Sequence, residues 1–297
     1  MNSEVVHSEF QPTQCEFSPN QAIGDIIKRT NNLSAEEVET ILSYQRDHGV
    51  KFGEAAVALG LAQQEDVLWA LAQQFNYPYS GKSSGAMSEE LIAANKPFSD
   101  QAEILRGIRD QIISGLYQSG DMRRRALAIM SASPGDGKSF LAANLAVVMA
   151  QLTGRTLLID CDMRTPRQHE IFRVDNASGL SAILSGRAVG SVLRQVKNYP
   201  GLYVLPVGIV PPNPLELLQR PAFGMLINDL VGKFDHVVID TPSVTQGVDA
   251  RVIAAVAGAA MVVARKDKTR TDALNAVVSP LVSRKGIKMI GVVMNEF

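Results

Sequence analysis

The chain has 297 residues, of which 46% are apolar and 20% are charged, and this composition excludes a wholly disordered protein. Its 29 Lys and Arg residues almost balance its 30 Asp and Glu residues, for a net charge of −1. This balance argues against the broadly basic surface that nucleic-acid binding requires, so we expect no nucleic-acid partner.

The length favours two domains, and other global features indicate a cytoplasmic setting. Two cysteines, Cys15 and Cys161, are too few for a disulfide framework and fit a reducing compartment. The N-terminus lacks the charged and apolar regions of a signal peptide. The longest apolar run, residues 252–264, is too short to cross a bilayer. We expect a cytoplasmic protein that reaches a membrane only through a partner.

The N-terminal part contains an internal repeat. Residues 1–19 are polar, and we expect a disordered tail there. Within residues 20–80, the segment at 23–25 (Ile-Gly-Asp) recurs at 52–54 (Phe-Gly-Glu), and further matches follow at the same offset. Each copy predicts a short helix, a turn and a longer amphipathic helix, and Ser34 with Glu37 forms a capping-box pattern. Two helical hairpins are therefore expected. Their predicted core comprises Ile26, Ile27, Val38, Ile41, Leu42, Val57, Leu59, Val67, Leu68 and Leu71, with Trp69 in the core or at an interface.

Residues 81–96 are predicted to be a linker, because the chain around 80–86 is rich in Gly and Ser. The second domain is expected to span residues 97–297 and to open with a helix over about 100–118. Spacing by three places Glu103, Arg106 and Arg109 on one side of this helix. A plain solvated face is the alternative reading of these three residues.

From residue 126 onward, apolar strands alternate with helical segments. Strands are predicted near 126–130, 156–160, 202–207, 236–240, 260–265 and 288–294. This alternation predicts an α/β fold in which helices cover both faces of a mainly parallel sheet.

Residues 131–139 (Ser-Ala-Ser-Pro-Gly-Asp-Gly-Lys-Ser) lie between the first strand and an apolar helix. A Gly-rich turn there forms a cradle of backbone N–H groups for phosphate, helped by the helix N-terminus. Lys138 is predicted to reach the β- and γ-phosphates, and the Ser139 hydroxyl to bind Mg²⁺. The strict pattern has a further Gly where this chain has Ala132. The predicted nucleotide-binding residues here are Ser133, Pro134, Gly135, Asp136, Gly137, Lys138, Ser139 and Phe140.

Acidic residues follow two later strands. Asp160 ends one buried strand and precedes Asp162, and Asp240 ends another. The carboxyl ends of parallel strands meet at one edge of the sheet, so we expect these acids beside the phosphate loop. Carboxylates there indicate Mg²⁺, which prefers oxygen ligands. Ser139, Asp162 and Asp240 are the predicted metal-binding set, although any single acid could be a helix cap.

With these motifs in view, residues 97–297 resemble the bacterial P-loop tyrosine kinases that control exopolysaccharide chain length. The phosphate loop, the acidic motifs at 157–166 and 237–242, and the E-x₂-R-x₂-R pattern of Glu103, Arg106 and Arg109 carry the resemblance. It implies ATP and Mg²⁺ as cofactors, regulation of exopolysaccharide polymerisation and export, and a homo-oligomer. It also implies activation by a transmembrane co-polymerase at the inner membrane.

The same resemblance assigns roles to individual residues. Lys138, Asp160, Asp162 and Asp240 are the expected catalytic residues, and Asp160 orients or deprotonates the tyrosine hydroxyl. Asn295 joins the nucleotide site. Arg164 either neutralises phosphate charge or forms a surface ion pair. Residues 20–80 resemble the N-terminal module of type II secretion and pilus ATPases, some of which bind cyclic di-GMP. Ala22 and Lys51 stand where that module has Arg, which favours a protein-interaction role over cyclic di-GMP.

The family usually carries a tyrosine-rich tail, whereas the six tyrosines of this sequence are at positions 44, 77, 79, 117, 199 and 203. The acceptor is therefore another tyrosine of the chain, such as Tyr77 or Tyr79, or lies on another protein, or the kinase activity is weak. The alternative function is an ATP-driven assembly switch without tyrosine phosphorylation, like partition and division-site ATPases. Those ATPases carry a second lysine where this chain has Ser133, which disfavours that reading.

Overall fold

The computed structural model describes residues 23–74, 87–117, 125–188 and 190–296. The chain divides into two compact units, a helical one within residues 9–85 and an α/β one from residue 86 onward. The predicted tail at 1–19, the Gly/Ser-rich stretch at 80–86, and Tyr77 and Tyr79 lie outside the described residues. No helix in the described ranges has the length and apolar content to span a membrane.

The helical unit has the four helices that the repeat predicts. Helices α1 (Ile23–Thr30) and α2 (Ala35–His48) form the first copy, and α3 (Phe52–Ala58) and α4 (Gln64–Gln74) form the second. The first two do not pack as a hairpin: α1 packs mainly against α4, and α2 against α3. The Ser34 hydroxyl accepts a hydrogen bond from Glu37 N at 3.2 Å, and Ser34 N donates to Glu37 Oε2 at 2.8 Å. The predicted capping box is therefore confirmed.

The core of this unit is smaller than the sequence predicts. Ile26, Ile27 and Ile41 are buried, and Trp69 packs against them as expected. Leu42 and Val57 were expected in the core but are 43% and 37% exposed. In α2 the apolar residues at positions 38, 41 and 42 form a stripe along the helix, and this stripe is wider than the surface that the neighbouring helices cover. Ile41 faces the core, and Leu42, about 100° further round the helix, does not.

The α/β unit begins earlier than predicted, because residues 87–96 are part of it and not a linker. This segment contains the short helix α5 (Ile92–Asn95), and Met87, Leu91, Ala93 and Ala94 are buried in its core. Asn144 Oδ1 accepts from Ala93 N at 3.0 Å, and Asn144 Nδ2 donates to Glu90 O at 2.8 Å. Asn144 is a polar residue in an apolar helix, so these bonds give it the partners that burial requires.

Seven strands form one sheet in the order β3-β4-β2-β5-β1-β6-β7. They are β1 (Ala126–Ser131), β2 (Thr156–Asp160), β3 (Arg194–Val196), β4 (Tyr199–Leu205), β5 (His236–Asp240), β6 (Gly258–Arg265) and β7 (Lys288–Asn295). All neighbours are parallel except β3, a short edge strand that runs antiparallel to β4. The sequence prediction missed β3, whose three residues are too few to show a periodic pattern.

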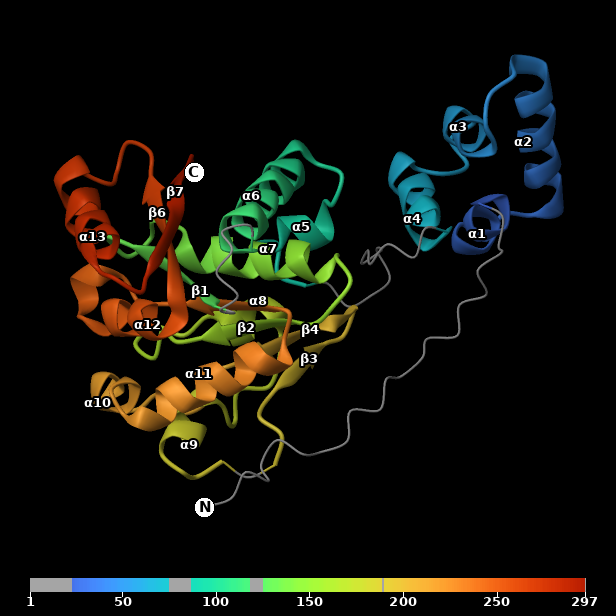
Figure 1. Cartoon of the computed structure of the whole chain (residues 1–297). Helices are drawn as coiled ribbons and strands as arrows, with labels where there is room; N and C mark the ends of the chain where they lie inside the picture. Colours follow the sequence, from blue (N-terminus) through green and yellow to red (C-terminus); the bar gives the residue numbers. More distant parts are fainter. Residues whose placement is uncertain (1–22, 75–86, 118–124, 189, 297) are drawn as a thin grey trace. The chain divides into compact units, whose positions relative to one another are not determined.

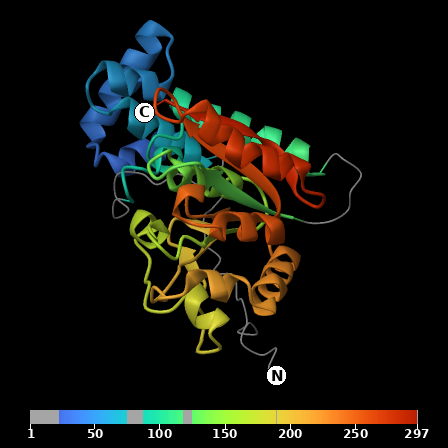
Figure 2. The same ribbon diagram turned by 90° about the vertical axis from the view of Figure 1, so that its left-hand side faces the viewer.

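Helices cover both faces of the sheet, as predicted (Figures 1 and 2). One face packs against α5, α6 (Asp100–Tyr117), α7 (Lys138–Ala150) and α8 (Gln168–Phe172). The other packs against α9 (Leu180–Leu184), α10 (Pro214–Leu218), α11 (Pro221–Lys233), α12 (Asp249–Ala257) and α13 (Thr271–Ser283). Alternate residues of β1 enter the two cores. A strand buried on both faces is apolar throughout, which is why the sequence shows runs and not alternation.

Candidate nucleotide-binding site

Three adjacent strands bring the predicted site residues to one edge of the sheet. β5 lies between β1 and β2. In this register Asp240 is opposite Asp160 on one side and Ile129 on the other. The phosphate loop leaves β1 two residues beyond Ile129. The sequence prediction that these motifs converge is therefore confirmed by the topology.

The phosphate loop has the backbone that its glycines permit. Gly135 and Gly137 have φ values of +79° and +101°, in the region that other residues rarely adopt. Pro134 and Gly135 are exposed, and Ser133 and Phe140 are half-buried. Asp136 is buried, and its carboxylate accepts from Ser133 N at 2.8 Å and from Thr269 Oγ1 at 3.1 Å. The Asp136 side chain thus fastens the loop from inside.

The ends of β6 and β7 hold the same loop from the other side. Asn295 Nδ2 donates to Asp136 O at 3.0 Å, and Arg265 Nη1 donates to Gly135 O at 3.2 Å. A Cβ atom on Gly137 would clash with Asn295 Nδ2, and its residue would have to adopt a φ of +101°, so a side chain there would displace the Asn295 amide and strain the loop. Sequence reasoning missed Arg265 and Thr269. The one sequence feature that could have pointed to them is their position at or just after the carboxyl end of β6, which lies at the same edge of the sheet as the loop.

Lys138 and Asp162 form a buried ion pair. Lys138 Nζ lies 3.3 Å from Asp162 Oδ2, and the two side chains are 10% and 1% exposed. Asp162 Oδ1 accepts from Arg164 N at 3.2 Å and from Thr165 N at 2.9 Å. The acidic motif after β2 therefore folds around the Asp162 carboxylate and holds it beside the phosphate-loop lysine.

Asp160 is completely buried and lies beneath this motif. Its Oδ1 accepts from Asp162 N at 3.1 Å, and its Oδ2 accepts from Arg167 N at 3.1 Å and Gln168 N at 3.0 Å. Burial, and then the charge of Asp240, raise the pKa of Asp160 well above its usual range. Both oxygens thus anchor the loop that joins β2 to α8.

Asp240 is also fully buried and carries one unsatisfied oxygen. Its Oδ2 accepts from Gln168 Nε2 at 2.8 Å. Burial raises the pKa of Asp240. The positive charge of Lys138 opposes this rise, and so do the nearby donor groups of the Gln168 side chain and the Ser139 hydroxyl. Among the residues that the structure describes, Asp240 Oδ1 has no hydrogen-bond partner. A buried carboxylate oxygen without a donor is costly unless a cation or water meets it.

The donor set fits Mg²⁺ better than a metal held by protein ligands alone. Within the described ranges, no group of three or more His, Cys, Asp or Glu side chains could hold a metal ion. Asp160 accepts three backbone hydrogen bonds. Asp162 accepts from two backbone N–H groups and a threonine hydroxyl, and it pairs with Lys138. The predicted set of Ser139, Asp162 and Asp240 supplies one hydroxyl and two carboxylates, of which Asp240 has the oxygen without a partner among the described residues. Mg²⁺ keeps several waters and uses substrate phosphates, so it needs only a few such oxygens.

Of the two alternatives predicted for Arg164, phosphate neutralisation and a surface ion pair, the structure shows an ion pair, although its acidic partner is buried. Its Nη2 donates to Asp249 Oδ1 at 3.2 Å and to Oδ2 at 3.0 Å. The Asp249 side chain is 2% exposed and the Arg164 side chain 36%. The pair ties the acidic motif after β2 to the start of α12. Sequence reasoning did not single out Asp249.

The E-x₂-R-x₂-R residues are not a uniformly solvated face. Glu103 is 73% exposed, whereas Arg106 is 19% exposed and pairs with Glu103 Oε2 at 2.5 Å. Arg106 also donates to Pro97 O. Arg109 is 14% exposed and donates to Val148 O of α7 at 3.0 Å. The solvated-face alternative is wrong for the two arginines, which fasten α6 to its own unit.

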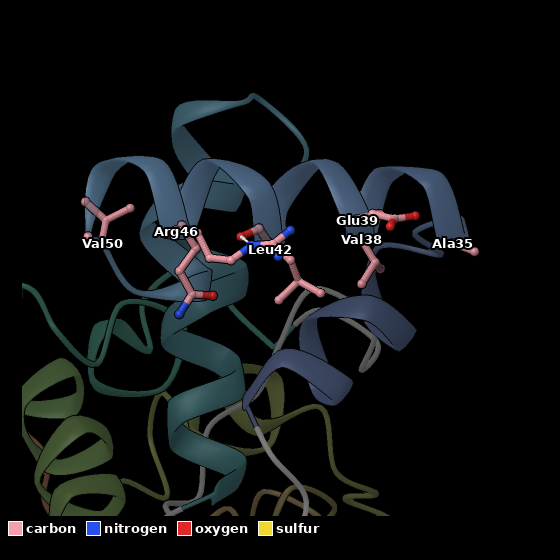
Figure 3. Close-up of a pocket in the computed structure, with 8 residues that line it drawn as sticks. Ala35, Val38, Glu39, Leu42, Arg46 and Val50 are labelled. Carbon is pink, nitrogen blue, oxygen red and sulfur yellow. Dashed lines mark hydrogen bonds between the residues drawn. The ribbon is translucent and has the colours of Figure 1, made fainter.

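A shallow groove of about 820 Å³ lies along α2 in the helical unit (Figure 3). Its lining combines apolar side chains, including the exposed Leu42, with one acidic and one basic residue. The lining residues are Ala35, Val38, Glu39, Leu42, Gln45, Arg46, Gly49 and Val50. Lys51 is not among them, so the described lining offers a single cation.

Comparisons with known proteins agree with this geometry. The family model of the CobQ/CobB/MinD/ParA nucleotide binding domain matches residues 127–297. Tyrosine-protein kinase YwqD of Bacillus subtilis is 35% identical over 209 residues, which are 70% of this chain and 86% of that protein. The chimerical protein CapA2B2 has a TM-score of 0.64 at 34% identity, over 70% of this chain and 90% of that one. The kinase domain of Escherichia coli tyrosine kinase ETK has a TM-score of 0.65 at 28% identity, over 72% and 83% of the two chains.

These matches concern the α/β unit and its nucleotide site. The predicted resemblance of residues 20–80 to a secretion-ATPase module finds no support among them, since the family model begins at residue 127. The kinase resemblance was predicted from the phosphate loop and the acidic motifs. The relatives that match this part of the chain are tyrosine kinases. The chain belongs to the family of bacterial P-loop protein-tyrosine kinases found in capsule and exopolysaccharide systems.

Proposed function

We propose that this kinase binds Mg-ATP at the edge formed by β1, β5 and β2 and transfers the γ-phosphoryl group to tyrosine in an exopolysaccharide system. The observation that carries the proposal is the convergence of Lys138, Asp162 and Asp240 on the phosphate loop. In particular, the Lys138 ammonium lies 3.3 Å from a carboxylate at this edge. Phosphoryl transfer depends mainly on such positioning and charge neutralisation.

Each residue has a definite part in this proposal. Lys138 binds the β- and γ-phosphates after leaving Asp162, and the loop from Ser133 to Phe140 supplies backbone N–H donors. Ser139, Asp162 and Asp240 hold Mg²⁺, which when bound neutralises charge on the transferred group. Asn295 braces the loop through Asp136 O.

The part of Asp160 is less direct. The family resemblance predicts that it orients or deprotonates the tyrosine hydroxyl. Its two oxygens accept three backbone hydrogen bonds, which supports an anchoring role for the acidic motif. Asp160→Asn separates the two roles, because loss of a base lowers kcat alone, whereas loss of an anchor also lowers the stability of the metal-free protein.

The test is phosphotyrosine formation by the full chain. The purified protein is incubated with Mg-ATP, with and without the cytoplasmic segment of its operon's membrane co-polymerase, and analysed by mass spectrometry. We expect phosphotyrosine from the wild type and none from Lys138→Met. No phosphotyrosine from wild type under either condition, or an equal signal from Lys138→Met, would contradict the proposal.

The acceptor is expected outside the sheet. Tyr199 is 1% exposed, and Tyr203 lies in β4, where its ring packs edge-to-face against Phe234. Neither can enter another active site without breaking the strand. Tyr44 of α2 is half-exposed, and Tyr77 and Tyr79 lie beyond the described residues. Tyr117, the last residue of α6, also lies outside the sheet. Phosphorylation is therefore expected at Tyr117, on the N-terminal part of the chain, or on a second protein.

The partner follows from the family and from one solved relative. The family resemblance implies a transmembrane co-polymerase as activator, and the similarity to the chimerical protein CapA2B2 supports a partner chain of the CapA type. Recruitment of a cytoplasmic kinase to the inner membrane is part of this proposal. Self-association through Glu103 on α6 also belongs to it, since this glutamate is the exposed member of its motif.

For the helical unit we favour protein interaction over cyclic di-GMP. A dinucleotide with two phosphates calls for several donors or cations. The α2 groove offers Arg46 alone among described cations, and Glu39 adds a negative charge to the same lining (Figure 3). Calorimetric titration with cyclic di-GMP is expected to show no binding.

The second candidate function remains an ATP-driven assembly switch that binds its partner without tyrosine phosphorylation. The burial of Tyr199 and the β-strand position of Tyr203 favour it, because they reduce the acceptors within the kinase unit. Nucleotide-dependent oligomerisation in the absence of any phosphotyrosine would select this function over the kinase.

A further inference from the structure

Gln168 connects the three motifs of the nucleotide site, and none of the roles described so far includes it. It is the first residue of α8 and is fully buried. Its backbone N donates to Asp160 Oδ2 at 3.0 Å. Its side-chain Nε2 donates to Asp240 Oδ2 at 2.8 Å and to Ser139 O at 3.1 Å. One residue thus touches the acidic motif after β2, the end of β5 and the start of α7.

The chemistry of its neighbours determines the orientation of the side-chain amide. The Asp240 carboxylate and the Ser139 carbonyl are both acceptors. Only the NH₂ group of a glutamine can face two acceptors, so the opposite orientation would place oxygen against oxygen. Gln168 Oε1 has no hydrogen-bond partner among the described residues.

This contact leaves Asp240 with one occupied and one free oxygen. Oδ2 is held by Gln168, and Oδ1 has no donor in hydrogen-bond geometry within the described part of the chain, although the nearby Ser139 hydroxyl lowers the pKa of Asp240. Gln168 adds a neutral donor to a carboxylate that lies between the negative charge of Asp162 and the positive charge of Lys138. A group that donates a hydrogen bond to one oxygen of a metal-binding carboxylate, and so orients it, commonly strengthens metal binding by that carboxylate.

We propose that Gln168 is a positioning residue that holds the Asp240 carboxylate with Oδ1 available to the hydrated divalent cation of the nucleotide complex. This inference rests on the proposed function only in assuming that a metal–nucleotide complex binds at this edge. It does not depend on tyrosine being the acceptor.

The test is a comparison of Gln168→Met with a matched control, Gln151→Met. Gln151 follows α7, donates through Nε2 to Ala93 O at 3.2 Å, and also has a buried, unpartnered Oε1. Both substitutions remove a side-chain amide and one or two hydrogen bonds, at a fully buried residue for Gln168 and a half-buried one for Gln151, and only Gln168 adjoins the acids. ADP affinity is measured in EDTA, and Mn²⁺ affinity of the ADP complex is measured by electron paramagnetic resonance.

We expect Gln168→Met to weaken Mn²⁺ binding about tenfold, the usual effect of removing such an outer contact. ADP affinity in EDTA should stay as in wild type, and kcat should fall with little change in KM for ATP at saturating Mg²⁺. Gln151→Met should lower thermal stability and leave Mn²⁺ affinity unchanged. Because Gln168→Met could fail to fold, Gln168→Asn serves as the second variant. It keeps an amide that is too short to bridge Asp240 and Ser139, and its Mn²⁺ affinity should fall as well.

Wild-type Mn²⁺ affinity in either folded Gln168 variant would overturn the inference. Equal loss of Mn²⁺ affinity in Gln151→Met would also overturn it, since a general loss of packing would then be the cause. The outcome is separate from that of the kinase assay. Weakened Mn²⁺ binding in a protein that forms no phosphotyrosine would uphold Gln168 as a positioning residue and reject only the proposed function.

Discussion

Lys138 and Asp162 are each other's counter-ions, with Nζ and Oδ2 3.3 Å apart and both side chains almost inaccessible to water. The lysine that is expected to bind phosphate is thus held in place by the acid that is expected to bind the metal. Removing Lys138 leaves Asp162 as a buried charge without a cation, and removing Asp162 leaves Lys138 with Asp240 as its remaining acidic neighbour.

A double-mutant cycle on this pair should show strong coupling in the metal-free protein. We expect Asp162→Asn or Lys138→Met alone to lower the free energy of unfolding by about 3 kcal/mol, and the double variant to cost less than the sum. Urea unfolding in EDTA measures all four proteins. Additive single effects would show that the two charges do not compensate each other in the folded chain.

Arg164 and Asp249 should behave as a structural pair and not as phosphate ligands. Arg164→Met leaves Asp249 buried without its cation, and we expect a loss of about 2 kcal/mol, moderated because the arginine is partly exposed. Asp249→Asn in the same chain should restore part of this loss. Nucleotide affinity, measured with a fluorescent ADP analogue, should be unchanged in Asp249→Asn. A clear loss of affinity in that variant would give the pair a role in binding.

Gly137 should not tolerate a side chain. Its φ of +101° disfavours any Cβ, and that atom would lie 2.1 Å from Asn295 Nδ2. We expect Gly137→Ala to reduce ADP affinity on the order of tenfold or more, because the loop must move to relieve the clash and the strain. Adding Asn295→Ala removes the clash but not the strain, so titration calorimetry should show partial recovery. Full recovery would mean that the clash is the whole effect.

Substitutions of Glu103 and Arg109 should have different effects, the first on self-association alone and the second also on the stability of the fold. Glu103 is 73% exposed, so Glu103→Ala should weaken self-association in sedimentation velocity experiments and leave the melting temperature unchanged. Arg109 donates to Val148 O from a mostly buried position. Arg109→Ala should therefore lower stability by about 1–3 kcal/mol as well. Equal melting temperatures for the two variants would contradict this division.

His236 should make the α/β unit sensitive to mild acid. Burial, opposed by the charge of Asp235 and reinforced by that of Arg109, lowers the pKa of His236 below its ordinary 6.5. The unfolded chain therefore takes up a proton more readily than the folded one. Stability from this group is complete above pH 6.5 and is lost as the pH falls from there through the folded-state pKa. Urea midpoints at about pH 7.5 and 5.5 should differ less in His236→Gln than in wild type.

The sequence by itself was sufficient for the α/β class, the parallel strands, the phosphate loop and the helical repeat. Each of these is local: a run of apolar residues buried on both faces, glycines at Gly135 and Gly137, a capping box at Ser34 and Glu37. Such local patterns can be recognised without knowing which segments pack together. Because the strands are parallel, their carboxyl ends lie at one edge, and this alone places Asp160 and Asp240 near the loop.

Only the tertiary structure decided which contacts these residues make. Gln168 lies far from Asp240 in sequence, and Arg164 from Asp249, and no spacing rule links either pair. Residues 87–96 look like linker because they follow a stretch rich in Gly and Ser, yet they pack into the core, where Asn144 bonds to the backbone of Glu90 and Ala93. Leu42 and Val57 look like core residues, yet too few neighbours reach them. Burial and hydrogen-bond partners depend on which segments pack together, and that is settled by the energy of the whole fold, not by any segment alone.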